Sequence, residues 1–224
     1  MKAEPHPLLK KQLSAREAVL VCAVLLLVVG VVYAAVLGVR AVLHKRAVTA
    51  AVPNVLAALR AQRGELQRVI EAYKAHYGFY PPMRSKLGER GVHNPLFYEL
   101  AGTRYDPQRK FFYVAYSKEP IAPETIEKYF NMTGFTNNLL YPNWPTNFLS
   151  ERPVSNNEFS PGSEMNGLYF FNEILDNDLV DDFDISTWRY TTAPAEHNSQ
   201  KFDLWVEVQV QGQRHLIGNW PEAQ

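Results

Sequence analysis

Six carboxylates lie close together late in the chain. Of all the groups of residues in this sequence, they are the best candidate for a metal-binding site. Closely spaced carboxylates on a loop can supply the roughly six to eight oxygen ligands that Ca²⁺ prefers. The segment lacks the glycine and the distal glutamate of an EF-hand loop, so a solvated acidic turn is the simpler interpretation. The six residues are Glu173, Asp176, Asp178, Asp181, Asp182 and Asp184. If calcium binds here, we expect its ligands to come from Asp176, Asp178, Asp181 and Asp182.

No other residues form a known catalytic or metal-binding pattern, so we expect neither enzymatic activity nor a required cofactor. The chain has no G-x-S-x-G motif, and Ser163 follows a proline and a glycine, as a turn serine would. None of its histidines belongs to an H-E-x-x-H motif, and His197 beside Asn198 is typical of a loop residue that forms hydrogen bonds. The single cysteine, Cys22, excludes an intramolecular disulfide and a cysteine zinc site.

The charge balance excludes a nucleic-acid partner on electrostatic grounds. Basic and acidic residues each number 23, which gives a formal net charge of zero. Lysines and arginines gather only beside the apolar segment near the N-terminus, and no basic patch follows it.

The first element that must position the rest of the chain is this uncharged apolar segment, residues 18–39. About 22 residues make roughly 33 Å of helix, which matches a hydrocarbon core of about 30 Å. A cleaved signal sequence would have a shorter apolar region of roughly 7–15 residues. We therefore predict a single membrane-spanning helix, followed by about 175 residues, which is enough for one extracytoplasmic domain.

The flanking charges leave the orientation nearly balanced under the positive-inside rule. Residues 1–12 are too short to form a core, so we expect this basic leader to stay in the cytoplasm and residues 79–224 to lie outside it. The basic flanking residues are Lys2, Lys10, Lys11 and Arg16 before the segment, and Arg40, Lys45 and Arg46 after it.

Helical periodicity continues beyond the membrane segment, so we predict one helix over residues 13–78. Apolar residues recur every three or four positions across residues 54–77, and charged residues occupy the opposite face, where Glu71 and Lys74 can pair. We expect Pro53 to bend the helix without ending it. Gly78 can adopt a left-handed conformation and end the helix. The expected buried stripe comprises Leu59, Leu66, Val69, Ile70 and Tyr73.

The remaining residues predict short helices and strands around a loop-rich middle. We expect helices at residues 96–100 and 123–130, and strands at 110–116, 167–171, 186–192 and 202–210. A two-residue turn at Gln211-Gly212 would place Val206 opposite Ile217 and Val208 opposite His215. Residues 131–167 are rich in asparagine, proline and aromatic side chains, which predicts an ordered loop that packs on the sheet or faces a partner. The fold class is α+β, with the helix on one face of an antiparallel sheet.

Two segments resemble a known family. The helix end has the pattern I-x-x-Y-x-x-x-x-G-x-Y-P over residues 70–81, and the last forty or so residues contain W-R-Y, D-L-W and I-x-N-W segments. Together with the apolar helix, these features resemble the type IV pilin-like proteins, above all the major pseudopilins of type II secretion systems. The segments are Trp188-Arg189-Tyr190, Asp203-Leu204-Trp205 and Ile217-Gly218-Asn219-Trp220.

The resemblance implies a structural subunit held in the inner membrane, with its C-terminal domain in the periplasm. It further implies assembly with other pilin or pseudopilin subunits and a secretion platform into a homo-oligomeric filament, and calcium in a C-terminal loop. The site residue it implies is Glu17, which would become the fifth residue after cleavage between Gln12 and Leu13 and pair with the N-terminal amine of a neighbouring subunit. Gln12 stands where the family has glycine. The alternative is a single-pass anchored binding or sensor domain that does not polymerise.

Overall fold

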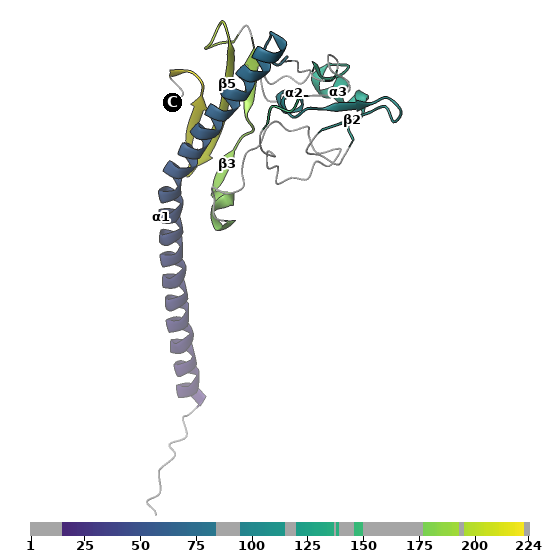
Figure 1. Cartoon of the computed structure of the whole chain (residues 1–224). Coiled ribbons are helices and arrows are strands. Elements are labelled where there is room, and N and C mark those ends of the chain that lie inside the picture. The colour runs from purple at the N-terminus through teal and green to yellow at the C-terminus, as the bar shows by residue number, and fades with distance from the viewer. Residues whose placement is uncertain are drawn as a thin grey trace, which may run out of the picture. The chain divides into compact units, whose positions relative to one another are not determined.

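The computed structural model describes residues 15–83, 95–114, 120–136, 138, 146–149, 177–192 and 195–221 (Figure 1). The chain divides into two compact units, Met1–Ala50 and Ala51–Gln224, and the boundary falls inside the first helix. The predicted cleavage site, the predicted strand at residues 167–171 and most of the predicted loop at 131–167 lie outside the described residues.

Helix α1 (Ala15–Tyr77) is 63 residues long and confirms the predicted element to within a few residues. It continues through Pro53, so this proline does not end it. Gly78 ends it with φ +85°, and its N–H donates to the carbonyl of Lys74 at 2.7 Å. This left-handed position after the last turn is the one that glycine occupies at the lowest steric cost.

In the first unit, the described apolar side chains of α1 are exposed, except that of Val48, which is 1% exposed. Leu26 is 73% and Leu20 is 68% exposed, and a mean hydropathy of 2.8 marks the most apolar window of the helix. A helix in the core of a soluble protein would instead bury most of these side chains. By length and composition, α1 can cross a membrane once, and it is the one helix among the described residues that can do so.

In the second unit, α1 buries one stripe of its surface. The predicted core residues are each at most 1% exposed, whereas Arg60, Glu65 and Arg68 on the remaining surface are exposed. The periodicity of residues 54–77 therefore reflects packing in this unit. The buried residues of the stripe are Val55, Leu59, Leu66, Val69, Ile70 and Tyr73.

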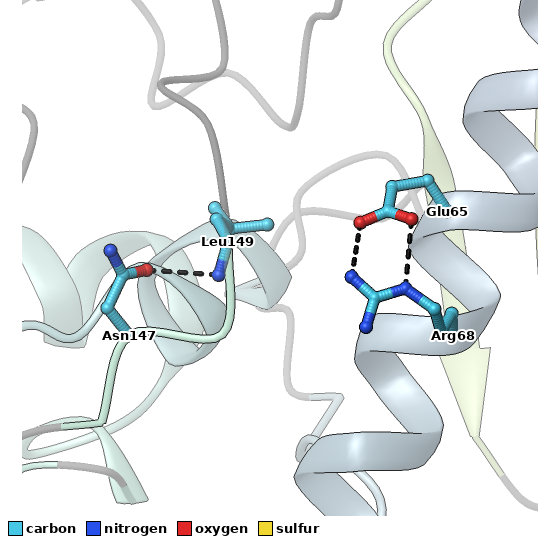
Figure 2. Close-up of polar contacts among 4 residues, drawn as sticks. All are labelled: Glu65, Arg68, Asn147 and Leu149. Atoms are coloured by element: carbon cyan, nitrogen blue, oxygen red, sulfur yellow. Dashed lines mark hydrogen bonds and ion pairs between the residues drawn. The ribbon is translucent and has the colours of Figure 1, made fainter.

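The charged face of α1 pairs differently from our prediction. Arg68 forms a two-pronged contact with Glu65, with Nε donating to Oε2 at 3.0 Å and Nη2 donating to Oε1 at 2.5 Å (Figure 2). Glu71 and Lys74 do not pair, because each contacts Tyr80 instead. The Tyr80 hydroxyl donates to Glu71 Oε1 at 3.1 Å, and Lys74 Nζ lies 4.2 Å from the centre of the Tyr80 ring.

The main sheet is antiparallel and centred on β5 (Phe202–Val210). On one edge β5 pairs with β4 (Arg189–Thr192) and β3 (Phe183–Ile185), and on the other with β6 (Gln213–Gly218). The predicted hairpin is confirmed, with Val206 opposite Ile217 and Val208 opposite His215. Gln211 and Gly212 both have positive φ, 51° and 77°, as the tight two-residue turn requires.

The second half of α1 covers one face of this sheet (Figure 1). Leu204, Val206 and Val208 are buried on this inner face, and the Arg63 Nη1 donates to the carbonyl of Gly218 at 2.6 Å. The chain just beyond α1 also contacts the sheet, because the Tyr190 hydroxyl donates to the carbonyl of Pro81 at 3.0 Å. The second unit is therefore α+β, with a helix on one face of an antiparallel sheet, as predicted.

A second, smaller layer was only partly predicted. It contains α2 (Leu96–Leu100), the antiparallel pair β1 (Arg104–Asp106) and β2 (Phe111–Tyr113), and α3 (Pro123–Phe130). The bounds of α2 and α3 match the prediction, whereas β1 was missed and β2 ends earlier than the predicted strand. A three-residue strand is too short to display the period-two pattern on which prediction depends.

Truncation of Ile70 tests whether the stripe of α1 is core. Ile70 is fully buried, so Ile70→Ala should lower the free energy of unfolding by about 2–5 kcal/mol through lost burial and a residual cavity. Arg60→Ala, on the exposed face of the same helix, should change it by less than about 0.5 kcal/mol. Tryptophan fluorescence during denaturation is the measurement. All four tryptophans follow residue 140, so they report on unfolding of the second unit, which contains the stripe. Equal losses in the two variants would show that the stripe is not core.

Candidate functional site

The residues predicted for subunit assembly lie at the start of α1. Glu17 falls in the first turn of the helix, while its side chain and the residues Gln12 and Leu13 lie outside the described part of the chain. The structure therefore gives the backbone conformation at Glu17 and the exposure of the apolar surface that follows it. The pairing of Glu17 and the cleavage of the leader stay predictions.

The acidic segment is described only in part. Asp178, Asp181 and Asp182 fall in the 3₁₀ helix η1 (Asn177–Asp182), with Asp181 exposed and Asp182 partly buried. Asp176 and the side chain of Asp178 lie outside the described residues. Within the described ranges, no three aspartate, glutamate, histidine or cysteine side chains gather closely enough to hold a metal ion. Calcium binding at the predicted four residues stays a prediction.

The closing motifs meet around one buried carboxylate, Asp203, which is 1% exposed. Its Oδ2 accepts the backbone N–H of His197 at 3.0 Å. Its Oδ1 accepts both the backbone N–H and the side-chain Nδ2–H of Asn198, each at 2.9 Å. Alternation along β5 places Asp203 on the face opposite Leu204, where a strand residue is usually exposed. Asp203 is buried nevertheless, because the loop at 195–198 folds over the carboxylate and satisfies its hydrogen bonds.

Asn219 completes this network from the end of β6. Its Oδ1 accepts the Leu204 N–H at 3.0 Å and the Asn198 Nδ2–H at 3.2 Å, and its Nδ2 donates to the carbonyl of Phe202 at 2.9 Å. The amide side chain thus replaces a missing strand partner where β6 has ended. The asparagines and the aspartate of the H-N, D-L-W and I-x-N-W segments therefore fasten the loop and the last strand to β5.

The outward side of the same strands carries rings and charges. The His197 ring stacks on Trp220 with centroids 4.0 Å apart and planes 10° apart, and Trp205 meets Trp220 edge-on at 6.0 Å. Glu207 lies between two guanidinium groups, with Arg214 at 2.6 Å and Arg189 at 3.5 Å. All of these residues except Arg189 line a hollow of about 180 Å³ on the face of the sheet opposite α1.

A second buried carboxylate, Glu99 in α2, was not identified from the sequence. It is fully buried, its Oε2 accepts the Tyr73 hydroxyl at 2.8 Å, and its Oε1 accepts the Thr136 N–H at 2.8 Å. Burial, together with this carboxylate, raises the pKa of the Tyr73 hydroxyl well above its usual value. Glu99 thereby ties the end of α1 to the start of the loop at residues 131–167. The sequence did contain a signal for this burial, because Glu99 is the one charged residue within the apolar run at 96–100.

The described residues of that loop pack on the smaller layer and on the end of α1. Phe135 stacks on Tyr98 with centroids 5.1 Å apart, and the Phe148 ring lies 5.4 Å from Tyr73. Asn147 Oδ1 accepts the Leu149 N–H at 3.0 Å, which makes a local turn (Figure 2). The ordered-loop interpretation is therefore confirmed for residues 146–149 and 131–136, with a different packing partner from the one predicted.

Removal of the Asn219 side chain tests the network. Asn219→Ala leaves the Leu204 N–H buried without its side-chain acceptor, which should lower the free energy of unfolding by about 1–3 kcal/mol. Gln209→Ala, at an exposed position of β5, should be nearly neutral. Chemical denaturation monitored by tryptophan fluorescence measures both. A neutral Asn219→Ala would mean that water replaces the amide and that the network does not hold the strand.

Added calcium tests the acidic segment. If calcium binds the native fold there, the melting temperature should rise with calcium concentration, because a ligand that binds only the folded state stabilises it. The rise should vanish in the double variant Asp178→Asn, Asp181→Asn, and should persist in Glu124→Gln, which changes an exposed carboxylate in α3. A melting temperature indifferent to calcium would leave a solvated acidic turn.

No family model matches this chain, and no curated protein and no solved structure matches it either. Its function must therefore be argued from its own residues.

Proposed function

We propose that this chain is a structural subunit of a type II secretion-like or type IV pilus-like filament. In this proposal it is a pseudopilin, held in the inner membrane by the first half of α1 with its C-terminal domain in the periplasm. It assembles through that same half of the helix with other copies and related subunits, on a membrane platform, and it catalyses no reaction.

The observation that carries the proposal is the division of α1. Its N-terminal half exposes a continuous apolar surface, whereas the half within the second unit buries a narrow stripe against the antiparallel sheet. An exposed apolar surface of this length needs lipid or other helices around it. A filament supplies the helices after the subunit leaves the bilayer, and the membrane supplies the lipid before that.

The helix-end motif and the closing motifs each form contacts that hold this fold together, which supports the proposal further. The helix-end motif places Tyr73 on Glu99, Gly78 in the left-handed position and Tyr80 5.2 Å from the Phe202 ring of β5. The closing motifs fasten the final hairpin through Asp203 and Asn219. Both therefore maintain a helix-on-sheet domain directly attached to the apolar helix.

Glu17 is the residue on which assembly should depend. A carboxylate at the start of a membrane helix is costly unless it reaches the interface or is paired. Cleavage between Gln12 and Leu13 would give a neighbouring subunit a free amine that can pair with it. If the leader is not cleaved, Arg16 or a lipid headgroup would have to be the partner of Glu17.

The chain would then be an anchored binding domain that does not polymerise. Two observations favour this second candidate: Gln12 at the position where the family has glycine, and the hollow beside Trp205.

We predict that Glu17→Ala abolishes filament assembly and leaves membrane insertion intact, because alanine only makes insertion of the helix easier. The matched control is Glu65→Ala, which removes an exposed carboxylate from the other half of the same helix. Assembly can be measured by crosslinking Cys22, which is exposed and is the only cysteine, to single cysteines introduced across residues 24–32. The wild type and Glu65→Ala should give crosslinked ladders, and Glu17→Ala should give monomer.

Mass spectrometry of the purified protein tests the leader. A mature chain that begins at Leu13 supports pairing of Glu17 with a free amine. A full-length, monomeric protein that is indifferent to Glu17→Ala would overturn the filament proposal in favour of the anchored binding domain.

A further inference from the structure

The hollow on the outer face of the main sheet has a lining that is more acidic than basic. It forms where β5 and β6 meet the loop at 195–198 and the residues after β6. Its lining includes three carboxylates, on Glu196, Asp203 and Glu207, and the guanidinium of Arg214. A second guanidinium, on Arg189, also contacts Glu207, so Glu207 is already paired and the net negative charge comes from the other carboxylates. Arg214 is 62% exposed, so it lies at the solvent side of its contact with Glu207.

The most informative of these groups is Asp203, because it is buried with its charge unbalanced. Among the described residues, its carboxylate accepts amide N–H groups from His197 and Asn198, and no cationic side chain of that part of the chain contacts it. Neutral donors satisfy the hydrogen bonds of a buried carboxylate but leave its negative charge. Buried charges in proteins are usually paired with an opposite charge, so a cation in this hollow would complete an arrangement the fold leaves open.

Aromatic rings form the other part of the lining. Trp205 is partly exposed on the outer face, and Gly218 lies opposite it in β6, so no side chain on β6 covers the indole at that position. Trp220 and the stacked His197 stand beside it. An indole ring attracts cations through the negative potential of its face.

We propose that this hollow binds an organic cation of the guanidinium or alkylammonium class. The cation would lie against the Trp205 ring and within the field of Asp203, Glu196 and Glu207. It could be carried by an arginine or lysine side chain of a polypeptide or by a quaternary ammonium compound, since both present the same chemistry. The inference does not rest on filament assembly, because the hollow lies on the sheet face opposite α1.

The test uses the full chain in a nonionic detergent, with ¹⁵N-labelled indoles observed by NMR. The probes are N-acetyl-argininamide, N-acetyl-lysinamide and choline, at a pH of about 8, where free imidazole is neutral. N-acetyl-citrullinamide serves as the control ligand, since it has the shape of the arginine probe without its charge. We expect saturable shifts of the Trp205 and Trp220 indoles, with dissociation constants on the order of 1 mM for a single cationic group.

Trp188 provides an internal reference because it is 1% exposed and does not line the hollow. Its indole should not shift with any probe. The citrulline probe should bind at least about tenfold more weakly than the arginine probe, because it lacks the charge that the carboxylates and the indole attract. Arginine or lysine probes binding more tightly than choline would indicate a polypeptide side chain, and the reverse order would indicate a quaternary ammonium compound.

Three variants of the lining and one control variant separate binding from folding. Glu196→Gln changes an exposed position and should weaken binding by about two- to fivefold. Trp205→Leu should weaken it by about tenfold, as seen from Trp220. Asp203→Asn should abolish the preference for the arginine over the citrulline probe, and an unshifted Trp188 resonance verifies that this variant folds. Glu124→Gln in α3 should bind as the wild type does.

Three results would overturn the proposal. The first is the absence of any saturable shift of Trp205 and Trp220 up to about 20 mM of all three cations. The second is equal binding of the citrulline and arginine probes. The third is that a folded Asp203→Asn variant, or the Glu196→Gln variant, binds the arginine probe with wild-type affinity and keeps the wild-type preference over the citrulline probe. This result would show that the carboxylates serve only to fasten the loop.

Discussion

A single continuous helix that must satisfy two environments is the constraint on which the rest of this structure depends. In the first unit, nearly all described apolar side chains of α1 are exposed, and by length and composition this part of the helix can cross a membrane. In the second unit the same helix is amphipathic and buries a stripe that ends at Tyr73. The domain must therefore present an apolar sheet face to the helix. The helix must also end at Gly78, so that the residues beyond it can return to that sheet.

Two buried carboxylates attach loop segments to the helix and to the sheet by hydrogen bonds. Asp203 gathers the loop at 195–198 onto β5, and Glu99 joins the end of α1 to Thr136. Such groups are strongly destabilising when a partner is lost, because a charge is then left buried with unsatisfied hydrogen-bonding capacity. They fix particular backbone segments relative to their neighbours, which nonspecific apolar contacts do not. Asp203 belongs to the D-L-W segment, and Glu99 contacts Tyr73 of the helix-end segment.

Sequence reasoning succeeded where the signal was local and repeated. The length of α1, the bounds of α3 and the register of the β5–β6 hairpin follow from periodicity and from turn residues. It failed for β1 and β3, whose three residues show no period, and for Asp203 and Glu99. The burial of Glu99 is decided by partners that are distant in sequence, Tyr73 and Thr136. The burial of Asp203 is decided by the loop at 195–198, which is close in sequence but whose fold over the carboxylate follows from no periodic pattern. The assembly that we propose at Glu17 would depend on a neighbouring molecule, so the contacts within one chain do not reveal it.

The alternation of β5 connects the two proposals made for this protein. Leu204, Val206 and Val208 face α1, and the intervening Asp203, Trp205 and Glu207 face the hollow. A shift of the β5–β6 register by one residue would turn every side chain to the opposite face, so the helix-covered core and the outer hollow are specified together. Asn219 secures that register by accepting the Leu204 N–H where β6 ends. In the filament that we propose, a subunit would pack through the first half of α1, whereas the hollow lies on the sheet face opposite the second half of that helix. The same subunit could then bind the proposed cation without uncovering the sheet face on which α1 packs.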